Sequence, residues 1–229
     1  MEEERIALAN LNALLLGLLL VGVAVHRRNR ICRSFAVYVL TVLVCNRLIV
    51  MWPDTFYTSS FWLFKESLYW ILKLAVAAEI GLLTFSELPR ARRQLLVLLV
   101  AILVLAGLAQ LAPASPRPGD GFDWVGIAGP RGQAGLVCLL AAVVAMAVRY
   151  RVPLHPFHRA ILLGFGLYLV AYTGALALLR ELGSPAAYAL FNLLDPAAYA
   201  ASVGVWTWAA WRPAAAPSLA VQRLHPWAR

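Results

Sequence analysis

Seven long apolar runs constrain the fold of this chain more than any other feature of its sequence. As α-helices that rise about 1.5 Å per residue, such runs can cross the roughly 30 Å hydrocarbon layer of a bilayer. The chain is also 62% hydrophobic and 14% charged, whereas soluble domains are about half apolar and a quarter charged. The sequence therefore predicts an all-α, polytopic membrane protein with seven transmembrane helices. The runs cover residues 6–25, 34–52, 61–85, 95–111, 133–148, 160–179 and 186–211.

The runs leave no room for a separate soluble domain. We expect residues 1–211 to form a single seven-helix transmembrane domain, followed by a short cytoplasmic tail over 212–229. The longest stretch between runs, 113–132, is rich in proline and glycine, which predicts an external loop. The first run lacks the basic start and the cleavage site of a signal peptide, so we expect it to remain as a helix.

The distribution of arginine predicts the orientation. The stretches that follow the first, third and fifth runs, together with the tail, hold thirteen arginines, and the opposite side holds four. Cytoplasmic loops carry the excess of basic residues in membrane proteins. We therefore expect an external N-terminus and a cytoplasmic C-terminus. The heavy use of Arg, Ala and Leu suggests a bacterium with GC-rich codons, so the expected location is the inner (plasma) membrane. The same bias accounts for the net charge of +9, so the lipid bilayer and not nucleic acid is the expected surrounding.

The third run is unusual because it holds four ionisable residues, Lys65, Glu66, Lys73 and Glu79. An ionisable group near the bilayer centre is costly, by roughly 3 kcal/mol on insertion scales, unless it is paired or hydrated. Lys73 is expected near the midplane, on the helix face that it shares with Glu66. Lys65 is expected to extend outward, and Glu79 to reach the cytoplasmic arginines.

Two other runs offer partners for these charges. Arg47 in the second run is expected at the depth of Glu66, and Asp195 in the seventh run is expected near the midplane. The simplest predicted pairs are Arg47 with Glu66, and Lys73 with Asp195. Such pairs could serve only to hold the second, third and seventh helices together, because buried ion pairs fix the register of helices.

The alternative is a polar intramembrane pocket that binds a small molecule, an ion or a proton. Both lysines of the chain lie in the third run, and the other basic residues are arginines. Burial shifts the pKa of lysine readily, which favours a functional role for Lys73. The candidate ligand-binding residues are Lys73, Asp195, Glu66, Arg47, Asn46 and Tyr69. Further polar residues that could line the same pocket are Tyr38, Tyr168, Tyr172, Thr173, Asn192 and Tyr199.

Two helix-breaking features accompany these residues. Pro196 is expected to kink the seventh helix and to free a carbonyl beside Asp195. Gly164 and Gly166 are expected to permit either close helix packing or a kink in the sixth helix.

Several kinds of chemistry are disfavoured. No histidine lies inside a run, and Asp195 is the only aspartate that does. The chain also lacks a nucleophile elbow and a phosphate-binding loop. The sequence therefore predicts no cofactor, no metal site and no enzymatic activity.

Three segments are similar to other bacterial membrane proteins. They are Phe61-Trp62 with Lys65-Glu66, the basic stretch Leu88-Pro89-Arg90-Ala91-Arg92, and Gly164-Phe165-Gly166-Leu167-Tyr168. With these segments the chain resembles small bacterial seven-helix integral membrane proteins of unassigned function. It is also similar in plan to the seven-helix sensor regions of bacterial histidine kinases. This resemblance implies a sensor role and carries over no site residues. No kinase or other output domain follows Trp211, so we expect a protein partner.

The leading hypothesis is a non-enzymatic, receptor-like sensor, or a membrane subunit of a larger assembly, with a polar pocket among the second, third and seventh helices. Its partner would bind through the cytoplasmic loops or within the membrane. The alternative is a small ion- or proton-coupled transporter that uses Lys73 and Asp195. A membrane-embedded enzyme is the third possibility.

Overall fold

The computed structural model describes residues 2–111, 124–182 and 184–213. Its described part is all-helical and contains no strand, which confirms the predicted class. Each of the seven apolar runs corresponds to one long helix, and the runs over 34–52 and 61–85 end one residue beyond theirs. The elements are α1 (Glu2–Val25), η1 (Arg28–Arg30), α2 (Arg33–Met51), α3 (Pro53–Phe56), α4 (Ser59–Thr84), α5 (Pro89–Leu111), α6 (Trp124–Arg149), α7 (Pro156–Leu182) and α8 (Pro185–Trp211).

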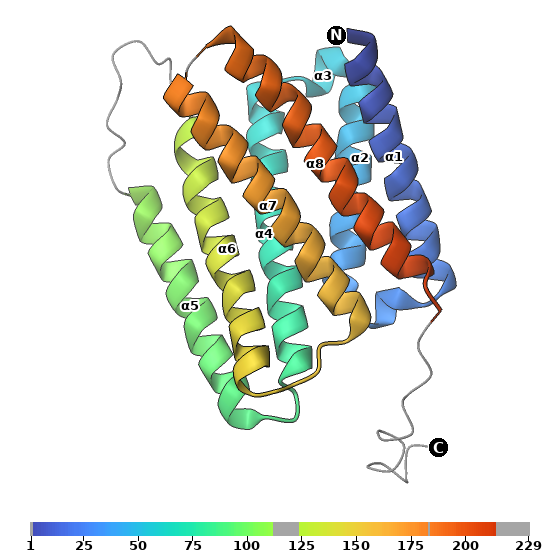
Figure 1. The fold of residues 1–229 in the computed structure, drawn as a ribbon. Coiled ribbons are helices and arrows are strands. Elements are labelled where there is room, and N and C mark those ends of the chain that lie inside the picture. Colours follow the sequence, from blue (N-terminus) through green and yellow to red (C-terminus); the bar gives the residue numbers. More distant parts are fainter. Residues whose placement is uncertain (1, 112–123, 183, 214–229) are drawn as a thin grey trace.

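The long helices run alternately up and down the bundle (Figure 1). Six of them form a closed ring in which α1 packs on α2, α2 on α4, α4 on α6, α6 on α7, α7 on α8, and α8 again on α1. Helix α5 lies outside this ring, against α6 and α4. Consequently the N-terminal halves of α1 and α8 and the C-terminal half of α2 lie at the same end of the bundle (Figure 1).

Proline positions explain why several helices begin earlier than predicted. Helices α5, α7 and α8 begin at Pro89, Pro156 and Pro185, since proline fits the first turn of a helix, where its missing N–H is not needed. Helix α6 begins at Trp124, so the predicted external loop is shorter than expected. The part of that loop over 113–123, and the tail beyond residue 213, lie outside the described residues.

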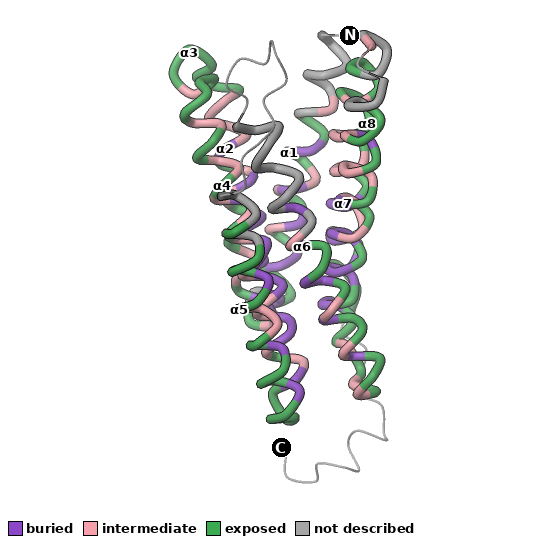
Figure 2. The backbone as a smooth tube through the Cα atoms, turned by 90° about the vertical axis from the view of Figure 1, so that its left-hand side faces the viewer, coloured by how far each residue is buried: buried purple, intermediate pink, exposed green. Residues whose placement is uncertain are grey.

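The outer surface of the bundle is largely apolar. Figure 2 shows exposed positions along the outward sides of the long helices, and they include Val148 and Val170, which are 73% and 70% exposed. By length and composition, three helices of the described chain are suited to cross a membrane, namely α2, α4 and α7 over Pro156–Leu178. Helices α1 and α6 contain shorter apolar stretches, Asn10–Val25 and Gly135–Arg149.

The turns between α1 and α2, between α4 and α5, and between α6 and α7 lie at one end of the bundle, here called the basic end (Figure 1). These turns and the adjoining helix termini contain most of the described arginines. The turn between α1 and α2 is held by buried side chains. Arg28 is 6% exposed, and its Nη2 donates to the carbonyl oxygen of Arg212 at 2.7 Å, which caps the C-terminus of α8. The Nε2 atom of His158 lies 3.1 Å from the carbonyl oxygen of Ile31. The described arginines of this end are Arg27, Arg28, Arg30, Arg33, Arg90, Arg92, Arg93, Arg149, Arg151, Arg159 and Arg212.

Glu79 caps the N-terminus of α2 from the neighbouring helix α4. Its carboxylate accepts hydrogen bonds from the backbone N–H groups of Arg33 at 2.9 Å and Ser34 at 2.7 Å. Burial raises the pKa of the Cys32 thiol to about 12, so the thiol stays protonated and donates to Glu79 at 3.4 Å. The prediction that Glu79 reaches arginine side chains is therefore wrong. The unsatisfied N–H groups and positive dipole end of α2 provide a closer partner.

Replacing Glu79 by alanine should lower the stability by about 1–3 kcal/mol, because two N–H groups at the start of α2 lose their acceptor. Glu79→Gln should lose less, since its amide oxygen can still accept one bond. Thermal unfolding of the purified protein in detergent measures both. Glu87→Ala is the matched control, because Glu87 is exposed at the same end. Equal melting temperatures for Glu79→Ala and Glu87→Ala would contradict the capping role.

Candidate functional site

A polar cavity lies among α1, α2 and α8, toward the end of the bundle opposite the basic end. Its volume is about 350 Å³, which is within the roughly 300–1,000 Å³ of small-molecule sites in proteins. Half of its lining residues are apolar and half are polar. The polar residues of the lining are Asn12, Asn46, Arg47, Asn192 and Asp195, and the apolar ones are Leu8, Ile49, Val50, Phe191 and Pro196.

Helix direction brings these polar residues together. Asn46 and Arg47 lie in the last turns of α2, which ends at Met51. Asn12 lies in the first half of α1, and Asp195 lies ten residues after the start of α8 at Pro185. Because these three segments share one end of the bundle, residues far apart in the sequence meet around one cavity.

Pro196 exposes backbone polar groups of α8 at the cavity. Proline has no N–H, so the carbonyl of Asn192, four residues earlier, lacks its donor within the helix. The carbonyl of Pro196 itself accepts a bond from Asn12 Nδ2 at 3.5 Å, which joins α8 to α1. The cavity thus lies beside the turn of α8 that lacks one backbone hydrogen bond.

Two oxygen atoms at the cavity are buried without a hydrogen-bond partner in the described part of the chain. They are Asn12 Oδ1 and Asp195 Oδ1. The Asn12 side chain is only 8% exposed. A buried polar atom without a partner costs roughly 1–3 kcal/mol, so proteins retain few of them. Both oxygens can accept hydrogen bonds from water or from another molecule in the cavity.

Arg47 supplies the positive charge of the cavity. Its Nη1 donates to Asn10 Oδ1 at 3.5 Å, which draws the guanidinium toward α1 and away from α4. The guanidinium is a planar fork of N–H donors, a shape that suits a ligand that carries a carboxylate. Arg47 and Asp195 therefore place opposite charges on the lining of the same cavity.

Tyr69, a predicted site residue, lies behind the cavity and not on its lining. Its hydroxyl is 3.5 Å from Asn46 Oδ1 and 3.5 Å from the carbonyl oxygen of Val42. Both oxygens can accept from this hydroxyl. The single hydroxyl proton can go to either oxygen, so Tyr69 connects α4 to α2 next to the cavity.

Lys73 is buried, with 4% of its surface exposed, and lies behind the cavity toward the centre of the bundle. Its Nζ is 5.3 Å from the centroid of the Tyr168 ring, a contact that attracts a cation. The described chain gives Lys73 no ion pair, although Glu66 and Asp195 act on its charge from a longer distance. The predicted Lys73–Asp195 pair is therefore not formed, because Tyr168 lies against both residues.

Glu66 is also placed differently from the prediction. Its carboxylate pairs with Lys65 Nζ at 3.3 Å and not with Arg47. Lys65 Nζ in turn lies 5.2 Å from the ring centroid of Trp62. The prediction relied on the similar depth of Arg47 and Glu66, but the Arg47 side chain is directed to the cavity beside α1 and α8.

The predicted site residues therefore divide into three groups. Asn46, Arg47 and Asp195 share the cavity, Tyr69 and Lys73 do not line it, and Glu66 lies in the first third of α4, paired with Lys65. Asn192 was predicted only as a further lining residue, and Asn12 was missed. The signal for Asn12 was its amide inside the first apolar run, where a polar group needs an internal partner.

No protein-family model, curated protein or solved structure matches this chain. The resemblance to bacterial sensor regions therefore stays a prediction. The cavity and its surroundings alone carry the functional argument.

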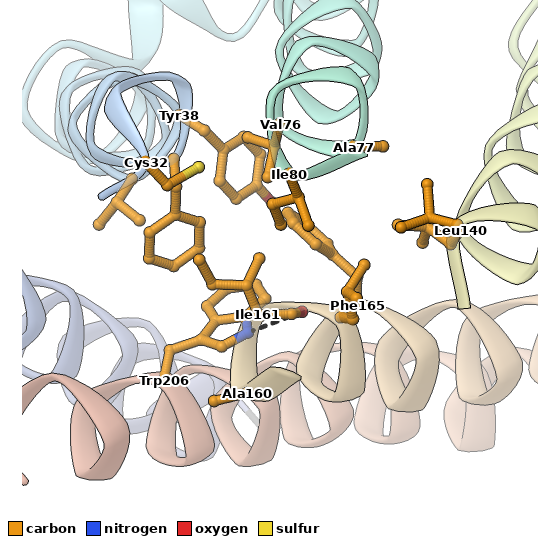
Figure 3. Packing of buried hydrophobic residues seen from close by; sticks show 14 of the residues in the cluster. Cys32, Tyr38, Val76, Ala77, Ile80, Leu140, Ala160, Ile161, Phe165 and Trp206 are labelled. Carbon is orange, nitrogen blue, oxygen red and sulfur yellow. Dashed lines mark hydrogen bonds between the residues drawn. The ribbon is translucent and has the colours of Figure 1, made fainter. Parts of the chain in front are cut away.

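A packed aromatic layer closes the bundle between the cavity and the basic end. Trp206 is fully buried, and its Nε1 donates to the carbonyl oxygen of Ile161 at 3.3 Å (Figure 3). The Trp206 ring contacts Phe165 and Phe35, with ring centroids 4.9 and 5.2 Å apart. Tyr38 completes the layer from α2 (Figure 3).

Gly164 allows this packing. A Cβ atom added at Gly164 would overlap the Trp206 ring, whereas an added Cβ at Gly166 would meet no atom within 4 Å. The predicted role in close helix packing is thus confirmed for Gly164. It does not hold for Gly166, which borders open space.

Proposed function

We propose that the chain crosses the inner membrane of a bacterium seven times, with its N-terminus outside and its basic end in the cytoplasm. The apolar outer surface supports burial in lipid, since soluble monomers rarely expose large contiguous apolar areas. The collection of arginines at one end supports the orientation. The cavity then opens toward the outside of the cell.

We further propose that the protein is a non-enzymatic, receptor-like sensor that binds a small polar molecule in this cavity. The observation that carries the proposal is the cavity itself, with opposite charges and three amides on its lining. The aromatic layer around Trp206 supports a receptor over a conduit, because it fills the bundle beneath the cavity. A change in α8 on binding would pass to a protein partner at the basic end or within the membrane.

The lining favours a small zwitterion such as a free amino acid. The Arg47 guanidinium matches the planar fork of a carboxylate. The unpartnered Asp195 Oδ1 can accept from an ammonium group. The lining carries a positive charge on Arg47 and a negative charge on Asp195, so it suits a molecule that carries both charges.

A proton-coupled transporter is the second candidate, and Lys73 is the observation that favours it. This lysine is buried without an ion pair in the described chain, beside a cavity that contains Asp195. Transport would require the aromatic layer to open during each cycle. Uptake of a radiolabelled ligand into liposomes separates the two candidates, since a receptor binds without uptake.

The test is a binding screen of the purified protein against glycine, alanine, glutamate, lysine and glycine betaine, with acetate and methylammonium as singly charged controls. At least one zwitterion should raise the melting temperature, and the singly charged compounds should not. Asp195→Asn and Arg47→Gln should each weaken its binding by at least about 30-fold, as expected when one partner of a charged contact is removed. Isothermal titration calorimetry measures the affinity.

The matched controls are Asp54→Asn and Arg92→Gln, which make the same chemical changes at exposed positions away from the cavity. Both should bind the zwitterion like the unchanged protein. Binding that survives Asp195→Asn and Arg47→Gln unchanged would contradict the proposed site. Binding of acetate or methylammonium alone would contradict the proposed ligand class.

A further inference from the structure

A second cavity lies between α6 and α7 at the basic end, far along the bundle from the polar cavity. Its volume is about 840 Å³. Helix α6 packs mainly on α5 and α4, and α7 packs mainly on α8. The two helices are joined by the stretch between Arg149 and Pro156, which spans the basic end from α6 to α7 (Figure 1).

The interior of this second cavity, here called the groove, is apolar and accessible from the outer surface. Val148, Leu163 and Leu167 line it and are 73%, 59% and 47% exposed. Gly166 also lines it, and a Cβ added there would meet no atom within 4 Å. The groove therefore has open space beside Gly166 that no side chain fills.

Two arginines lie on the lining of the groove at the basic end. Arg151 and Arg159 are both exposed, and the described chain offers neither of them an ion pair. The groove is apolar along α6 and α7 and basic at one end. It therefore suits an amphiphile whose acyl chain lies on the apolar part and whose anionic headgroup lies on the arginines. Basic pockets between transmembrane helices on the cytoplasmic side bind such headgroups.

We propose that this groove binds one anionic phospholipid, with an acyl chain along Gly166 and its phosphate on Arg151 and Arg159. The proposal rests on the proposed membrane location, and not on the ligand of the polar cavity. The bound lipid would fill the space between α6 and α7. The position of α7 would then depend on how much anionic lipid the cytoplasmic leaflet contains.

The test compares phosphatidylglycerol with phosphatidylcholine, each added to delipidated protein in detergent micelles. Phosphatidylglycerol should raise the melting temperature at lower concentration than phosphatidylcholine. Arg151→Gln and Arg159→Gln should each raise the midpoint concentration of phosphatidylglycerol about fivefold, and the double variant roughly 30-fold. Gly166→Leu should abolish the effect by filling the groove, and the open space at Gly166 allows this variant to fold.

Matched controls separate the groove from the general charge of the basic end. The double variant Arg92→Gln and Arg93→Gln removes two exposed arginines on α5, and Gly174→Leu adds the same side chain at another open position of α7. Both should keep the phosphatidylglycerol effect. Equal effects of the two lipids, a full effect in the groove variants, or loss of the effect in these controls would each overturn the proposal.

An alkaline wash of cell membranes tests the membrane location separately. Release of the protein by the wash would overturn both the membrane location and the lipid site. A protein that stays in the membrane, and whose melting temperature is indifferent to phosphatidylglycerol, would overturn the lipid site alone.

Discussion

Replacing Lys73 by methionine should stabilise the protein. Lys73 is buried and has the Tyr168 ring as its contact in place of a carboxylate. A lysine near the centre of a membrane helix costs roughly 2.5–3.5 kcal/mol, which the aromatic contact offsets only in part. We expect a gain of about 1–3 kcal/mol, which corresponds to a rise of roughly 3–10 °C in melting temperature.

The other lysine of the chain is the matched control. Lys65 pairs with Glu66 and lies over the Trp62 ring, so Lys65→Met should leave the melting temperature unchanged or lower it. If Lys73→Met instead lowers the melting temperature, and Asp195→Asn restores it in the double variant, then Lys73 and Asp195 form an ion pair that holds α4 and α8 together. A Lys73→Met variant that is stabilised but does not respond to ligand indicates a residue that is retained for function at a cost in stability.

Replacing Trp206 by alanine should cause the largest loss of stability. The side chain is fully buried among α2, α7 and α8, and its removal leaves a cavity where Phe35 and Phe165 now make contact. Large-to-small changes of buried aromatic residues cost about 3–5 kcal/mol. We expect the melting temperature to fall by roughly 10 °C or more.

Trp208→Ala provides the comparison, because Trp208 lies two residues later in α8 and is 57% exposed. Its ring carries the Arg212 guanidinium at 3.8 Å, a contact worth about 0.5–1 kcal/mol at exposed sites. A loss for Trp208→Ala as large as that for Trp206→Ala would show that the aromatic layer does not close the bundle.

The apolar middle of each long helix could be predicted from the sequence, but the first residue of most of these helices could not. Hydropathy marks the apolar middle of a helix, so the run over 95–111 was found and the first turns of α5 from Pro89 were not. The capping role of Glu79 was also hidden, since it depends on which helix terminus lies next to α4. Such a contact is set by tertiary packing, and the sequence of α4 alone does not contain it.

The sequence showed which polar residues belong to the candidate site, but it did not show which of these residues contact one another. A polar side chain inside an apolar run needs an internal partner wherever the helix lies, which made Asn46, Arg47 and Asp195 conspicuous. Depth alone could not show that Arg47 bonds to Asn10 of α1, or that Tyr168 contacts both Lys73 and Asp195. The rotation of each helix about its axis is decided by the packing of its neighbours.

Reaction of single cysteines with a membrane-impermeant maleimide on intact cells tests most directly whether the polar cavity opens to the outside and closes beneath. The three native cysteines are first replaced by alanine. Asn192→Cys, on the cavity lining, should react in intact cells, and Ser202→Cys, fully buried in α8, should stay unreactive from either side of the membrane. Reaction of Asn192→Cys only in inverted vesicles, or ready reaction of Ser202→Cys, would contradict an outward-facing cavity with a closed floor.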